Sequence, residues 1–173
     1  VIDCDNGTIR FLLNISKALD IMQLYHKGQN ISFISKNGFC AREFPFPNRF
    51  EGGMLYTCGL RNTGGSLVEN GEFFATHGRI HSIPAENCSA ICEDGNITIK
   101  GYIRETALFG HSLELKRTIT SKIGGSKIVI DDVVTNKTPA DEEYMIIYHM
   151  NFGFPFLSPE LKMTLPENIE TKP

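Results

Sequence analysis

Two glycine-containing dipeptides in the second half of the chain constrain its fold more than any other feature. Asp94-Gly95 separates a short run at 90–93 from an alternating run at 97–103. Such a pair between two extended runs is the strongest short-range signal for a tight β-hairpin. Gly124-Gly125 joins the runs 111–123 and 127–135 in the same way. The central part of the chain is therefore predicted to consist of antiparallel strands joined by hairpins.

The remaining segments also have the period of strands rather than helices. Between residues 8 and 15 the apolar side chains share one strand face: Ile9, Phe11, Leu13 and Ile15. Further short runs lie at 18–24, 31–34 and 144–150, and the proline-interrupted segment 42–49 is predicted to be an irregular extended loop. The sequence predicts an all-β fold, an antiparallel β-sandwich in which residues 1–173 form a single domain.

Charge and composition exclude several classes of protein. With 17 basic and 20 acidic residues the formal net charge is −3, unlike the strongly basic surface of a nucleic-acid-binding protein. No apolar run reaches the roughly 18 residues of a membrane span. Five irregularly spaced cysteines are an odd number, which favours reduced thiols over a disulfide scaffold. We therefore expect a cytoplasmic protein with no nucleic-acid or membrane partner. Its association into a homo-oligomer is left open.

A very apolar stretch at 146–155 carries two polar side chains, His149 and Asn151. On a strand these two residues face the same side, because side chains alternate. The Ile, Tyr, Met and Phe neighbours of His149 would remove water from its ring, as a general acid or base acting near pH 7 requires. His149 is thus a candidate catalytic residue, and a hydrogen-bonded core histidine is the structural alternative.

Three other segments place polar groups where the pattern expects apolar ones. If 75–81 is extended, His77, Arg79 and His81 project to one side, and a solvated strand face is the alternative. Glu105 interrupts the apolar positions of the run 97–109, so it is predicted to be buried and paired, in particular with an arginine. The glycine-flanked turn at 58–65 presents Arg61 and Asn62, and an exposed loop is its alternative.

Metal and cofactor chemistry has little support. His77 and His81 have a spacing that binds zinc on a helix, but Gly78 disfavours a helix and no companion motif follows. No glycine pair is followed by the Lys-Ser/Thr of a phosphate-binding loop. We expect no metal and no cofactor.

Seven short stretches, in this order, carry a resemblance to a known family: 18–21 (ALDI), 52–62 (GGMLYTCGLRN), 77–80 (HGRI), 83–86 (IPAE), 113–117 (LELKR), 130–136 (IDDVVTN) and 148–155 (YHMNFGFP). Taken together they resemble the aldose 1-epimerase-like proteins of the galactose mutarotase superfamily, and more closely a branch known mainly as a domain of unknown function. The resemblance covers nearly the whole chain.

The resemblance implies a large antiparallel β-supersandwich, of which this chain is the N-terminal and central portion. It also implies that the protein interconverts the anomers of a free sugar without a cofactor. The expected partner is therefore a small-molecule sugar. By resemblance His149 is the acid that protonates the ring oxygen and His77 binds substrate, while arginine and asparagine side chains donate to sugar hydroxyls. With the polar residues singled out above, the predicted substrate-binding set is His77, Arg79, Asn62, Arg61, Glu105 and Asn151.

The chain also departs from the family pattern. The turn after His149 reads Met-Asn-Phe-Gly rather than the usual mutarotase motif, so the resemblance does not imply which sugar is bound. The family's catalytic glutamate lies far downstream, in a portion outside these 173 residues. Two functions stay open: a mutarotase with His149 as acid and a glutamate as base, and a non-catalytic carbohydrate-binding module. A structural β-domain whose histidines fill the core is a third.

Overall fold

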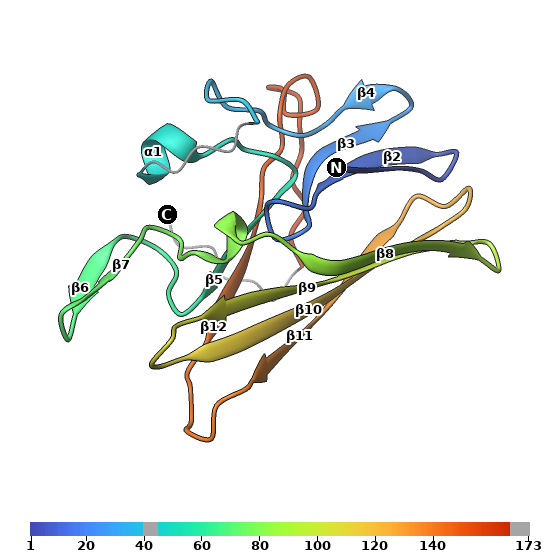
Figure 1. The fold of residues 1–173 in the computed structure, drawn as a ribbon. Coiled ribbons are helices and arrows are strands. Elements are labelled where there is room, and N and C mark those ends of the chain that lie inside the picture. Colours follow the sequence, from blue (N-terminus) through green and yellow to red (C-terminus); the bar gives the residue numbers. More distant parts are fainter. Residues whose placement is uncertain (40–44, 167–173) are drawn as a thin grey trace.

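The computed structural model describes residues 1–39 and 45–166, and its regular structure is almost entirely antiparallel β-strand (Figure 1). One four-stranded sheet contains β1 (Ile2–Asp5), β2 (Ile9–Asn14), β3 (Asp20–His26) and β4 (Gln29–Asn30). A second contains β8 (Glu86–Glu93), β9 (Asn96–Thr106), β10 (Ser112–Lys122) and β11 (Ile128–Asn136). Two strand pairs complete the fold: β5 (Leu55–Leu60) with β12 (Met145–Met150), and β6 (Leu67–Glu69) with β7 (Glu72–Phe74).

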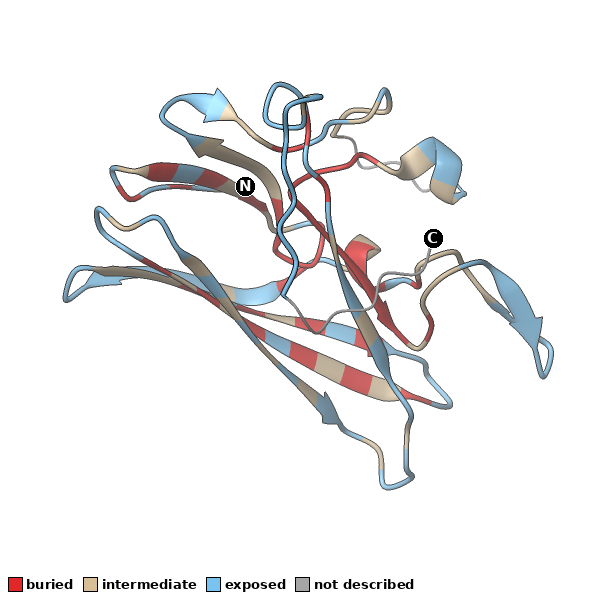
Figure 2. Cartoon of the chain, turned by 180° about the vertical axis from the view of Figure 1, so that it is seen from behind, coloured by how far each residue is buried: buried red, intermediate tan, exposed pale blue. Residues whose placement is uncertain are grey.

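The hydrophobic core lies between the two four-stranded sheets. Alternate residues of β9 and β10 are buried, because one face of each strand points inward, as Figure 2 shows. Phe11 and Leu13 of β2 pack there with Ile103 of β9 and Leu115 of β10, and none of the four is accessible to solvent. Removing these apolar side chains from water holds the sheets together. The predicted antiparallel sandwich is therefore confirmed.

Local turn chemistry fixes the two predicted hairpins. Asp94 and Gly95 both have positive φ, 49° and 72°, as the two central residues of a type I′ turn require. The flanking pair Glu93–Asn96 closes the β8–β9 hairpin. The β10–β11 connection turns at Gly124, whose φ is 71°. Both hairpins are confirmed.

Three predictions about the first half of the chain were wrong. Segment 31–34 is not a strand and contributes only isolated bridges. Within 42–49, the described residues Phe46–Arg49 form a short helix, α1, rather than an irregular loop, since Pro47 in its first turn has a helical φ. Residues 42–44 lie outside the described part. Segment 75–81 is a turn followed by the 3₁₀ helix η1 (Ile80–Ser82), not an extended row.

One buried arginine ties the sheets together. Arg117 of β10 is fully inaccessible to solvent, and its Nη1 donates to Asp20 of β3 at 2.5 Å. Its Nη2 donates to Thr57 of β5 at 2.9 Å and to Asp132 of β11 at 2.8 Å. The Tyr148 hydroxyl of β12 donates to the same Asp132 carboxylate at 2.9 Å. We call these five residues the ionic cluster, and they join five strands from three sheets.

No helix in the described part of the chain is long and apolar enough to cross a membrane.

Replacing the central arginine tests the ionic cluster. Arg117→Met keeps the length of the side chain but leaves two buried carboxylates without their cation. Breaking a buried ion pair from one side costs about 3–5 kcal/mol, so we expect the free energy of unfolding in urea to fall by that amount. Arg10→Met is the control, because Arg10 pairs with Asp3 at the exposed surface and such a pair contributes little. Equal stabilities of the two variants would contradict a structural role for the cluster.

Candidate functional site

The structure brings two of the predicted site residues, His77 and His149, together. Their ring centroids lie 5.6 Å apart, with the ring planes at 69°. His149 lies on β12 opposite Tyr56 of β5, and His77 lies in the turn between β7 and η1. These histidines lie together although they come from segments more than 70 positions apart in the chain.

Backbone geometry holds His77 in this position. His77 has a φ of 62°, a conformation that few residues other than glycine adopt. Its N–H donates to Gly64 O at 2.8 Å, and its carbonyl accepts from Gly59 N at 3.1 Å. The next residue, Gly78, has a φ of 77°, and a Cβ there would lie 2.1 Å from Gly59 O. Only glycine allows this close approach to β5, so the turn presents His77 towards β12.

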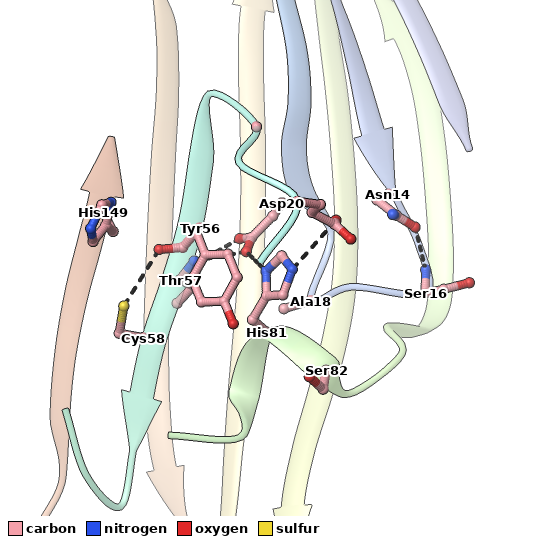
Figure 3. Close-up of polar contacts among 12 residues, drawn as sticks. Asn14, Ser16, Ala18, Asp20, Tyr56, Thr57, Cys58, His81, Ser82 and His149 are labelled. Carbon is pink, nitrogen blue, oxygen red and sulfur yellow. Dashed lines mark hydrogen bonds and ion pairs between the residues drawn. The ribbon is translucent and has the colours of Figure 1, made fainter. Parts of the chain in front are cut away.

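Aromatic side chains surround both histidines. We call this set the aromatic cluster: Phe46, Phe50, Tyr56, His77, His81 and His149. The Phe46 ring contacts His77 at 5.0 Å between centroids, and Phe50 contacts His149 at 6.1 Å. Tyr56 stacks on His81 at 3.7 Å, and Figure 3 shows these two rings next to the strand that carries His149. The rings of the cluster form an aromatic surface that contains three imidazoles, two of them in the His77–His149 pair.

Each of the two histidines has a buried ring nitrogen without a hydrogen-bond partner. The Nδ1 atoms of His77 and His149 are buried and have no hydrogen-bond partner among the described residues. Burial lowers the pKa of His77, and the neighbouring His149 lowers it further. His77 is therefore neutral at physiological pH, and each unpartnered nitrogen is a position for a hydrogen bond to a polar ligand group.

His81 has a different role from the one expected. It does not project beside His77 and Arg79: its Nδ1 lies 2.6 Å from Asp20 (Figure 3). Its Nε2 lies 3.5 Å from Glu51. Burial by itself would lower the pKa of His81, but the hydrogen bonds and charges of the two carboxylates outweigh it and raise the pKa. Because Asp20 also binds Arg117, His81 extends the ionic cluster to Tyr56, on whose ring it stacks.

Glu105 and Arg79 line a cavity next to the histidines. It has a volume of about 940 Å³, and we call it the arginine cavity after the ionisable side chains of its lining: Arg49, Arg79, Arg104, Glu105 and His111, with Phe46 at one side. Arg79 thus shares a cavity with Glu105, and Phe46, which contacts His77, lies at the boundary between the cavity and the histidine pair.

Glu105 is buried as predicted, with 4% of its surface exposed, but its partner differs. Its carboxylate accepts from the backbone N–H of Leu60 at 2.8 Å, rather than from an arginine side chain. Burial raises the pKa of Glu105, although that hydrogen bond and the charges of Arg79 and Arg61 oppose the shift. A buried carboxylate needs a hydrogen-bond donor. Here the backbone N–H at the end of β5 is that donor, in place of a side chain.

The other three predicted residues use their polar atoms within the protein. Asn62 donates to Ala75 O at 2.7 Å, and Asn151 donates to Gly53 O at 3.0 Å. Arg61 pairs with Glu72 at 2.5 Å and faces a separate pocket, which Asn62 and Met145 also line. The structure therefore does not bring Arg61, Asn62 and Asn151 into the arginine cavity.

Sequence reasoning missed three residues of this region. Arg49 belongs to the proline-interrupted segment that was assigned to an irregular loop, where an arginine between Phe46 and Phe50 was the available signal. Tyr56 and Glu51 lay within or beside the 52–62 motif without any local pattern to distinguish them. The described residues contain no group of three His, Cys, Asp or Glu side chains able to hold a metal ion.

Comparison with solved structures identifies the fold. The chain superimposes on the crystal structure of a candidate aldose 1-epimerase from Klebsiella pneumoniae subsp. pneumoniae, with a TM-score of 0.77 and 20% sequence identity. The match covers 88% of this chain and 43% of the other, so the chain has part of the aldose 1-epimerase-like β-sandwich and spans less than half of that protein's length.

The family follows from the sequence. Residues 1–172 match the family described as Domain of unknown function (DUF4432), and the chain belongs to it. No curated protein matches the chain at a significant level. The fold and family predicted from the ordered motifs are confirmed.

Titration of the histidine pair tests the geometry. We expect the NMR-monitored pKa of His77 to lie below 6.5 and to rise in His149→Ala, because the neighbouring charge is removed while burial remains. Since unfolded His77 holds a proton more tightly than folded His77, its contribution to stability is lost as the pH falls below about 6.5.

His111 is the internal control for this titration. Burial and Arg61 lower its pKa, and His149 does not act on it. An equal shift of both histidines in His149→Ala would point to a general change of structure instead of a local contact.

Proposed function

We propose that this protein binds a free aldose at the His77–His149 pair and interconverts its anomers by general acid–base catalysis. The observation that carries the proposal is the pair itself: two imidazoles 5.6 Å apart, each with an unpartnered buried nitrogen, within a wall of aromatic rings. The aromatic surface suits the C–H face of a sugar, and the nitrogens suit its oxygens. The likeness in fold to a candidate aldose 1-epimerase supports the same function.

The reaction needs one proton delivered and one removed. His149, as imidazolium, donates a proton to the ring oxygen while a base takes the proton of the anomeric hydroxyl. The bond between C1 and the ring oxygen breaks, which gives the open aldehyde. Rotation about C1–C2 and the reverse proton transfers then close the other anomer. Neither a cofactor nor net oxidation is required, and His77 holds a sugar hydroxyl in place.

The base in this proposal is a glutamate supplied by the remaining part of the fold, as the family resemblance implies. Glu105 is the inward carboxylate that the sequence singled out, but Leu60 N–H binds it and it faces the arginine cavity. A cytoplasmic location belongs to the same proposal, and the described cysteines support it because all four are free thiols: Cys4, Cys58, Cys88 and Cys92.

Polarimetry on freshly dissolved α-glucose, α-galactose and other aldoses tests the proposal. Removing a general acid typically costs about 10²–10⁴-fold in rate. We therefore expect His149→Ala in the full-length protein to lower the rate of anomer exchange by about that factor. His26→Ala, at the exposed end of β3, is the matched control and should retain full activity. A protein that binds aldoses yet accelerates no anomer exchange would be a carbohydrate-binding module instead.

The position of the base is tested separately. We expect the 173-residue chain alone to mutarotate sugars little faster than buffer, and a longer polypeptide with the rest of the fold to be active. A fully active short chain would transfer the base role to Glu105. In that case Glu105→Gln, which keeps the shape and can still accept from Leu60 N–H, should abolish turnover.

A further inference from the structure

The arginine cavity has positive charge that its own residues do not compensate. Arg104 is already neutralised, because it binds Glu86 at 2.6 Å and Glu114 at 2.8 Å. Arg49 and Arg79 differ from it. Within residues 1–39 and 45–166, neither of these two guanidinium groups has a carboxylate within ion-pair distance.

The partners of these two arginines are neutral oxygens. Arg49 donates to Ser82 Oγ and, at 3.4 Å, to Gly78 O, while Arg79 donates to Phe73 O at 3.0 Å. A guanidinium carries five N–H donors, so these contacts leave donors on both side chains for a ligand.

Glu105 does not cancel this charge. It is the one carboxylate among the lining residues of the cavity, and it is held at the inner wall by Leu60 N–H. The lining contains this one carboxylate and two arginines without an ion pair, so its net charge is positive. A guanidinium fork matches phosphate and carboxylate oxygens in geometry as well as in charge.

The cavity adjoins the histidine pair. Phe46 lines the cavity and contacts the His77 ring, and Arg49 reaches the carbonyl of Gly78, the residue after His77. A volume of about 940 Å³ lies within the range of small-molecule sites. A ligand with its reacting end at the histidines would have to pass the Phe46 ring to extend into the cavity.

We propose that the arginine cavity binds the anionic group of an acidic aldose, a sugar that carries a phosphate or a carboxylate away from its anomeric carbon. Arg49 and Arg79 bind the anion, and the sugar ring lies against the aromatic cluster. The inference rests on the proposed function for the position of the ring. It assigns the substrate class, since a neutral aldose leaves both guanidinium groups without an ion-pair partner.

Calorimetric binding to the full-length protein tests the substrate class. The probes are glucose, glucose 6-phosphate and glucuronate, and inorganic phosphate serves as a competitor. We expect at least one acidic sugar to bind about tenfold or more tightly than glucose, because hydrogen bonds to charged groups contribute that much. The acidic sugar that binds tighter identifies phosphate or carboxylate as the anion. This preference should shrink as salt is raised, and phosphate should compete.

Substitutions locate the anion. Arg49→Gln and Arg79→Gln should each reduce the preference for the acidic sugar about tenfold, and Arg79→Lys, which keeps the charge without the fork, should reduce it less. Arg10→Gln, an arginine paired with Asp3 outside the cavity, should leave the preference unchanged. Circular dichroism confirms that each variant is folded, and the salt dependence of the unsubstituted protein gives an answer that needs no variant.

Equal binding of glucose and both acidic sugars, or a preference that survives both glutamine variants, would overturn the inference. Its failure is distinguishable from failure of the proposed function, because anomer exchange is measured independently by polarimetry. His149-dependent exchange of neutral aldoses without any anion preference removes the substrate class alone. Arginine-dependent binding of an acidic sugar without exchange supports the anion site and removes the mutarotase activity.

Discussion

The buried cation of Arg117 is the constraint on which the rest of this fold depends. Taking a guanidinium out of water is costly, and the cost is met only if oxygen atoms surround it in good geometry. Asp20 and Asp132 supply the charges, and Thr57 supplies a hydroxyl. Together with Arg117 these residues come from four different strands, so the arginine is satisfied only when the sheets are assembled in one arrangement. Apolar packing alone would tolerate small displacements of one sheet against the other.

The same cluster extends to the candidate site. Asp20 binds both Arg117 and His81, and His81 lies flat against Tyr56, which is the cross-strand neighbour of His149. A continuous series of contacts thus connects the centre of the sandwich to the histidine pair. Rigid support of this kind matters for proton transfer, because donor and acceptor must hold their geometry to within a fraction of an ångström.

Two kinds of surface meet at the Phe46 ring. On one side are the aromatic cluster and two imidazoles with unpartnered nitrogens, which suit an uncharged sugar ring. On the other is a cavity with guanidinium groups, which suits an anion. The short helix α1 supplies both Phe46 and Arg49, so one four-residue segment contributes to both surfaces. If both proposals hold, the histidine pair is the position of the chemistry and the arginine cavity is the position of anion binding.

The sequence by itself determined the strands β2, β3 and β8 to β12, the two hairpins and the antiparallel fold class, because alternation and turn chemistry act between residues close in the chain. Its ordered motifs also identified the family, and His149 stood out as a polar residue on an apolar strand. Only the tertiary structure decided the rest. Arg117 meets Asp20 across 97 positions, and the φ of His77 depends on the close approach of Gly78 to β5. Such partners are selected by burial and hydrogen-bond geometry between distant segments, and a local sequence pattern contains no information about which distant segment will be there.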